Sequence, residues 1–219
     1  MHHDIILPIF GLQVHTALMI YIIIGLAIFS FLMAKRLKMV PGQTQSIIEL
    51  VVDAFTGLID QSMGPKGRRY FPFIMTFAVF IFFANVLGMI PGLLPPTANL
   101  NTTVALALIV FFATHIIGVK EHGLKYLKHF VGPVWWLAPL MIPIEIIGHI
   151  ARPVSLSLRL FGNMMGHEQI VTVLLILMPA AYPLLALSTA LGVLVIFIQS
   201  FIFALLSMMY LGGALEEAH

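Results

Sequence analysis

Residues 12–34 form a run without a charged side chain, and this run limits the possible folds more than any other feature. At about 1.5 Å per residue, a helix of this length crosses a hydrocarbon core about 30 Å thick. Other long apolar runs follow, and 60% of all residues are hydrophobic whereas 9% are charged. A soluble domain of 219 residues cannot bury that much apolar surface. The sequence therefore predicts an all-α membrane protein.

The apolar runs predict five membrane-crossing helices in one polytopic domain that occupies residues 1–219. Each run is bounded by charged residues, proline or glycine. The expected spans are about 12–34, 71–90, 101–119, 140–178 and 184–213. The fourth run is too long for a perpendicular helix, so it either breaks near Pro153 or crosses strongly tilted. We favour the tilt with local bending, and expect the last two helices to form a long tilted hairpin around residues 179–183.

A further helix over about residues 46–62 should be amphipathic. Its polar residues Glu49, Asp53, Thr56 and Asp60 recur at helical spacing among aliphatic and aromatic residues. We expect it at the membrane surface or under a partner, with a soluble loop helix as the alternative. The two tryptophans in residues 133–136 are also expected at the headgroup level.

The loop charges predict an orientation. Lysine and arginine occur in residues 35–38, 66–69 and 120–128, and are absent from 1–11, 91–103 and 179–183. The positive-inside rule places the basic segments in the cytoplasm. We therefore expect a multi-pass protein of the cell (inner) membrane, with the N-terminus outside and the C-terminus cytoplasmic.

Several functional classes are disfavoured by what the sequence lacks. There are no cysteines, the nine histidines are scattered, and the net charge is only +2. Disulfides and thiolate metal sites are thus excluded, and a metal centre, a cofactor or nucleic-acid binding is not expected. The sequence also contains no HExxH, GxSxG or phosphate-binding loop, so we do not expect the chain to be an enzyme by itself.

Arg159 is the main functional clue, because its neighbours on both sides are uncharged and apolar. A cation at such a position costs at least about 2.5–3.5 kcal/mol on insertion scales, so it marks a functional site. At about 100° per residue, a strip of small residues lies within roughly 60° of it: Gly148, Ser155, Gly162 and Gly166. Such a strip lets another helix approach closely. The strip alone could be a packing device, but packing does not explain the lone arginine.

Polar groups lie on either side of Arg159 and indicate a proton path. His167 and Glu168 lie toward the outer end, where Gln199 of the last helix should reach a depth similar to that of Glu168. Glu145 and His149 lie toward the other end. Glutamate and histidine in a hydrated crevice can relay protons. A structural bundle in which these groups simply pair is the alternative.

The segment SLSLRLFGNMMGHE at 155–168 resembles subunit a of the F-type ATP synthase membrane sector. IQSFIFALLSMMYL in the last helix and PPTANLNTT before the third span extend the resemblance over essentially the whole chain. It implies a hairpin curved around a rotating ring of c subunits. The implied partners are this c-ring, the b subunits of the peripheral stalk, other synthase subunits, the lipid bilayer and protons.

The resemblance also implies residue roles. Arg159 resembles the family's essential stator arginine and Asn163 the asparagine beside it. Glu168 and Gln199 correspond to outer half-channel positions, and Glu145 to the acid near the inner exit. His167 resembles a histidine that relatives can carry on the last helix, where this chain has Gly192. Asn99 and Gly88 stand where some relatives have aspartate, which puts in doubt an acidic contribution from the second and third spans.

The sequence thus predicts a non-catalytic, proton-translocating stator subunit with two offset half-channels. The expected contacts with the c-ring are the four small residues around Arg159. A self-contained transporter and an intramembrane enzyme are the alternatives. The chain shows neither an inverted repeat nor a nucleophile–base pair that would favour them.

Overall fold

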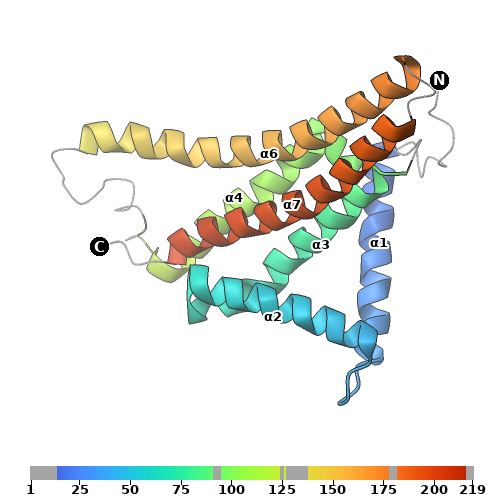
Figure 1. The fold of residues 1–219 in the computed structure, drawn as a ribbon. Helices are drawn as coiled ribbons and strands as arrows, with labels where there is room; N and C mark the ends of the chain where they lie inside the picture. The colour runs from blue at the N-terminus through green and yellow to red at the C-terminus, as the bar shows by residue number, and fades with distance from the viewer. Residues whose placement is uncertain (1–13, 91–94, 124–125, 127–137, 178–181, 216–219) are drawn as a thin grey trace.

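The computed structural model describes residues 14–90, 95–123, 126, 138–177 and 182–215. Every regular element in these ranges is helical, which confirms the predicted all-α class. The α-helices are α1 (Val14–Lys35), α2 (Gln43–Met63), α3 (Phe71–Leu87), α4 (Leu100–His122), α6 (Ala138–Leu177) and α7 (Tyr182–Leu215), shown in Figure 1. Two short 3-10 helices, η2 (Pro65–Tyr70) and η3 (Pro96–Ala98), precede α3 and α4.

The described residues contain five helical segments that are long and apolar enough to cross a membrane. They are His15–Lys35, Pro65–Leu87, Leu100–His122, Pro139–Ile176 and Pro183–Leu215. The basic segment 66–69 before the second span is helical, since η2 runs directly into α3. The segment 133–136 and most of the turn 179–183 lie outside the described residues. The chain is therefore an all-helical membrane protein.

Helix α7 is central to the bundle, because it contacts α2, α3, α4 and α6. Helices α6 and α7 run antiparallel and diverge toward the start of α6 (Figure 1), which is the predicted long hairpin. The core lies where α7 meets α3. The rings of Phe77 and Phe203 stack there with centroids 5.9 Å apart, and Ile81, Met208 and Leu211 are fully buried beside them.

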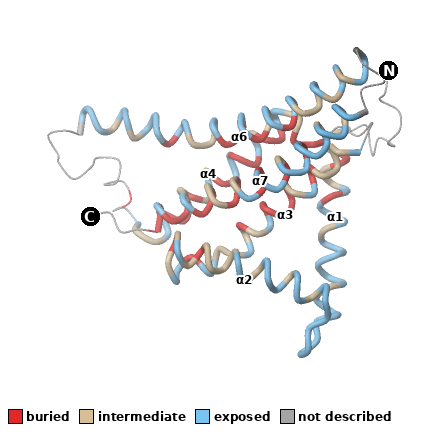
Figure 2. The backbone as a smooth tube through the Cα atoms, viewed as in Figure 1, coloured by how far each residue is buried: buried red, intermediate tan, exposed pale blue. Residues whose placement is uncertain are grey.

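Burial is uneven along the helices. Buried residues gather where α3, α4, α7 and the middle of α6 meet, whereas much of α1 and the first half of α6 are exposed (Figure 2). The exposed side chains there are mostly large and apolar, as on Ile144, Ile147 and Phe31. Lipid or another apolar helix suits these faces, since neither requires polar groups.

Helix α6 continues through Pro143 and Pro153, so the broken-helix alternative is wrong. Proline has no N–H and cannot bond the carbonyl four residues earlier, which favours bending at these positions. The ribbon of α6 indeed curves along its length (Figure 1).

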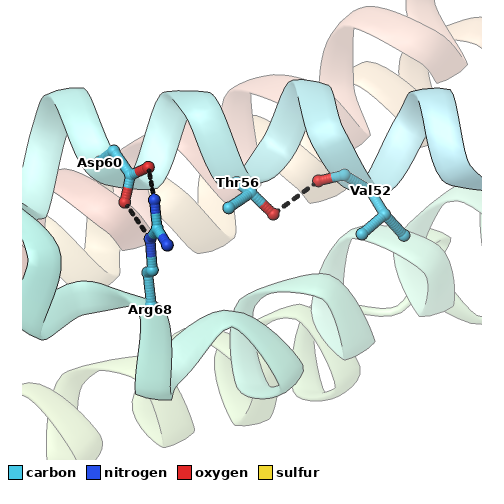
Figure 3. Close-up of polar contacts among 4 residues, drawn as sticks. All are labelled: Val52, Thr56, Asp60 and Arg68. Atoms are coloured by element: carbon cyan, nitrogen blue, oxygen red, sulfur yellow. Dashed lines mark hydrogen bonds and ion pairs between the residues drawn. The ribbon is translucent and has the colours of Figure 1, made fainter.

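Helix α2 is the predicted amphipathic helix, and its second half packs on the bundle. Ile59 and Met63 are buried, and Phe55 contacts Phe201 of α7 edge to face, with centroids 6.4 Å apart. On the polar face, Arg68 donates two hydrogen bonds of 2.7 Å to Asp60 (Figure 3), and these lower the pKa of that carboxyl. Thr56 donates to the carbonyl of Val52 at 2.7 Å. A position at the membrane surface stays a prediction.

Candidate functional site

Arg159 lies on an exposed face of α6, between residues that anchor the helix. Leu156 and Leu160 are buried in the core, so the helix turns Arg159 away from it. Within the described part of the chain, Arg159 forms no ion pair and no hydrogen bond. The arginine is therefore fixed in position by its helix while its charge remains available.

The small residues predicted around Arg159 form an open face. A Cβ added at Gly148, Gly162 or Gly166 would meet no atom within 4 Å outside the local helix, and Ser155 is exposed. The three glycines thus make no close contact with another helix in the described part of the chain. A second helix could approach the backbone of α6 here, on the same side as the arginine.

Asn163 joins α6 to α7 one turn after Arg159. Its Nδ2 donates a hydrogen bond of 2.7 Å to Oε1 of Gln199, whose side chain is buried. Gln199 therefore lies level with Asn163. The expectation that it shares the depth of Glu168 placed it five residues too far along α6. Asn163 and Gln199 are equally far from residue 181, so symmetry about the turn accounts for their pairing.

His167 faces Gly192, as the resemblance implied. A Cβ at position 192 would lie 2.6 Å from the ring carbon Cε1 of His167, so glycine provides the room for the imidazole. Glu168 is the next residue and is half-buried. The end of the hairpin where α6 finishes and α7 begins therefore carries an imidazole between the two helices and a carboxyl beside it.

A second polar group lies toward the start of α6. Oε1 of Glu145 is 3.3 Å from Nε2 of His149, and the His149 ring is 5.1 Å from that of His115 on α4, between centroids. Nδ1 of His115 lies 2.9 Å from the Tyr126 hydroxyl. Sequence reasoning did not single out His115 or Tyr126. The sequence could have pointed to His115, since it is the only titratable side chain between Asn101 and Val119.

Asn99 and Gly88, for which the resemblance implied aspartate in some relatives, have roles in backbone structure here. Asn99 caps α4 by accepting a 2.9 Å hydrogen bond from the N–H of Asn101. A Cβ at Gly88 would lie 2.7 Å from Cγ of Pro95, so a larger residue requires Pro95 to move. Capping preferences could have identified Asn99 from the sequence.

A buried polar pair between α3 and η3 was also missed. Thr97 donates a 2.6 Å hydrogen bond to Oδ1 of Asn85, and both residues are fully buried. Nδ2 of Asn85 has no hydrogen-bond partner among the described residues. The sequence did contain a signal for this pair, because Asn85 is a lone asparagine within an apolar run.

The described ranges contain no group of three His, Cys, Asp or Glu side chains that could hold a metal ion.

Comparison with known proteins agrees with this arrangement. The family model described as ATP synthase A chain matches residues 15–212. "ATP synthase subunit a 1" of Syntrophotalea carbinolica is 56% identical over 210 residues, which cover 96% of this chain and 89% of that protein. "ATP synthase subunit a" of Geobacter sulfurreducens is 54% identical over 90% of this chain and 86% of its own. The chain that places Arg159 on the open face of a long helical hairpin therefore belongs to the ATP synthase A chain family.

Proposed function

We propose that this chain is the proton-translocating stator subunit of a rotary ATP synthase in the cell (inner) membrane. It provides two offset half-channels beside a ring of c subunits and couples the proton-motive force to ATP synthesis. It carries no catalytic residue for ATP chemistry, which belongs to other subunits. Its further partners are the b subunits of the peripheral stalk and the remaining subunits of the complex.

The observation that carries the proposal is Arg159 on an open strip of small residues. An unpaired cation at membrane depth is costly unless a partner supplies a counter-charge. A passing ring carboxylate supplies that charge, and the exposed glycines of α6 let the ring helix come near. The family to which the chain belongs supports the same partner.

The outer half-channel uses the end of the hairpin. A proton reaches Glu168 and His167, which are half-buried side by side. It continues along the α6–α7 seam past Asn163 and Gln199, which share a hydrogen bond one helical turn after Arg159. It then neutralises a carboxylate on the ring. The neutral carboxylic acid can move into lipid, whereas the ionised form cannot.

The inner half-channel uses the start of α6. After nearly a full turn of the ring, the carboxylic acid releases its proton toward Glu145, and Arg159 attracts the carboxylate that results. A guanidinium does not lose its proton in a protein, so Arg159 also blocks direct proton passage between the half-channels.

The test is Arg159→Ala in the assembled synthase. Removing the fixed charge should abolish ATP synthesis and ATP-driven pumping, while passive proton leak persists or rises. Arg159→Lys should also fail in synthesis, because lysine lacks the planar guanidinium and can lose its proton when desolvated. The measurements are ATP synthesis and proton flux in membrane vesicles after assembly has been verified.

Arg36→Ala is the matched control, since Arg36 is an exposed arginine beyond the end of α1. It should keep synthesis near the wild-type rate. Coupled synthesis near wild type in Arg159→Ala would contradict the proposal.

A further inference from the structure

We propose that the inner proton path leaves the face of α6 sideways, through a relay of Glu145, His149, His115 and Tyr126. This inference rests on the proposed function above and adds a route to it. Helix α4 then takes part in conduction instead of serving only as a support for the hairpin. The relay joins α6 to α4 and to the residues that follow α4.

The first part of the relay is a carboxylate–imidazole contact on α6. Glu145 and His149 are one helical turn apart, and the Oε1–Nε2 distance is 3.3 Å. Glu145 is partly exposed, with 34% of its side chain accessible, whereas His149 is buried. A proton that reaches Glu145 can therefore pass inward to an imidazole that bulk water does not reach.

The second part is a small cavity between the two imidazoles. Their ring centroids are 5.1 Å apart. The adjoining cavity has a volume of about 10 Å³, which is near the size that holds one water molecule. Most of its lining surface is apolar, but five polar side chains from three helices also border it: Thr114, His115, His149, Arg152 and Tyr210. A water held there can connect His149 with His115, because it can both accept and donate a proton.

Pro153 adds to the polarity of this cavity. It lines the cavity, and because proline has no N–H it cannot bond the carbonyl oxygen of His149 four residues earlier. Arg152 also lines the cavity, and its guanidinium lies over the ring of Tyr210 at 5.4 Å from the centroid. The fixed charge of Arg152 is thus held beside the imidazoles of His115 and His149.

The third part is the contact between His115 and Tyr126. The Nδ1–hydroxyl distance is 2.9 Å. Gly118 makes this contact possible, since the Tyr126 ring occupies the space where a side chain at position 118 would begin. Tyr126 is buried, and burial raises the pKa of its phenol, so the hydroxyl stays protonated and can donate and accept in turn.

Proton transfer along the relay needs only water besides these side chains. The protonated carboxyl of Glu145 donates to one nitrogen of His149, and the other nitrogen releases a proton to the water in the cavity. This water donates to one nitrogen of His115, whose other nitrogen passes a proton to the hydroxyl oxygen of Tyr126, and that hydroxyl releases its own proton to water on the side of the membrane where α4 ends. Rotation of the imidazoles and the hydroxyl then restores the starting arrangement. Among the described residues, the charged and titratable groups along this path include Glu145, His149, Arg152, His115, Tyr126 and Tyr210.

The test uses the complete synthase in vesicles and measures passive proton flux through the membrane sector with the soluble catalytic sector removed. His115→Leu should lower the flux about a hundredfold, the lower end of what a positioned proton-transfer group contributes. Tyr126→Phe keeps the ring and removes only the hydroxyl, and should also lower the flux. His122→Leu is the control, because it removes an imidazole from the same helix that does not line the cavity.

Two readouts separate a relay from a packing role. Added imidazole should restore flux in His115→Ala, where the truncated side chain leaves room for it. The double variant His115→Leu with His149→Leu should conduct as poorly as the worse single variant, since both act in one series path. Additive losses without rescue by imidazole would overturn the relay and assign the histidines to packing.

The same vesicles distinguish this inference from the proposed function. Wild-type flux in His115→Leu, with Arg159→Ala still uncoupled, would overturn the relay alone and mean that protons leave directly from Glu145. Coupled synthesis in Arg159→Ala would overturn the proposed function itself.

Discussion

His167 illustrates how one residue depends on another that has no side chain. Its imidazole fills the space beside Gly192, with ring atoms as close as 2.6 Å to the position of a Cβ. The imidazole can therefore be supplied by either helix but not by both. Under the proposed function, we therefore expect the ring between α6 and α7 to matter, and not the helix from which it comes.

Exchanging His167 and Gly192 tests whether either helix can supply the imidazole. His167→Gly should lower proton-driven ATP synthesis about tenfold or more through loss of a proton-transfer group. Gly192→His alone should also be impaired, because two rings cannot share the space. The combination of both changes should recover most of the lost activity, measured as ATP synthesis in vesicles. A combination no better than its worse member would leave His167 as a packing residue.

The residues near Arg159 show which features of the site were predictable. Arg159 and its small neighbours follow from sequence because charge and helical angle are local properties. The contact of Asn163 with Gln199 was also within reach, because both residues are equally far from the middle of the predicted turn at residue 181. His115 was predictable by the reasoning used for Arg159, since it is a lone polar group in an apolar run. Its proximity to His149 requires the packing of α4 on α6.

At the scale of elements, the crossing of α2 and α7 is set by a close backbone approach. A Cβ at Gly212 would lie 2.7 Å from the carbonyl oxygen of Ser62, whereas one at the adjacent Gly213 would meet nothing within 4 Å. The backbone of α2 cannot yield as a flexible side chain can. The end of α7 thus fixes the position of the second half of α2.

The pair of glycines provides a matched experiment. Gly212→Ala should destabilise the folded protein by about 1–3 kcal/mol, as overpacking does. Gly213→Ala should stabilise it by roughly 0.5–1 kcal/mol, because alanine loses less entropy in a helix. Both are measured as shifts in thermal unfolding of the detergent-purified chain. Equal shifts in the two variants would mean that α2 does not pack on α7 at this point.

The helices themselves were largely predictable, since long apolar runs require them in lipid. The second span ends at Leu87 and not near residue 90, because Gly88 begins a series of turn hydrogen bonds. The continuity of α6 through two prolines was an open question from sequence alone. Local preference argues against proline inside a helix, and contacts with α4 and α7 override it.

At the scale of the whole molecule, two of the three basic segments meet at one end of the bundle. Arg69 at the start of α3 forms an ion pair with Glu121 at the end of α4. Arg68 pairs with Asp60 of α2, and α2 in turn contacts the end of α7 at Gly212. The N-cap of α4 lies at the opposite end of that helix. The loop charges and the folded arrangement therefore agree that the start of α3 and the end of α4 share a side.

Which side is cytoplasmic can be determined with introduced thiols, because the chain has no cysteine of its own. Gly67 is unsuitable, since a side chain there meets Met63. The exposed residues Lys66, Lys120 and Asn101 are better positions. In intact inverted vesicles, a membrane-impermeant maleimide should label Lys66→Cys and Lys120→Cys, and should reach Asn101→Cys only after the vesicles are opened. The positive-inside rule predicts this because the basic ends of α3 and α4 remain in the cytoplasm. Labelling of positions 101 and 120 from the same side would contradict both the orientation and the crossing of α4, and with them the two-sided half-channels that the proposed function requires.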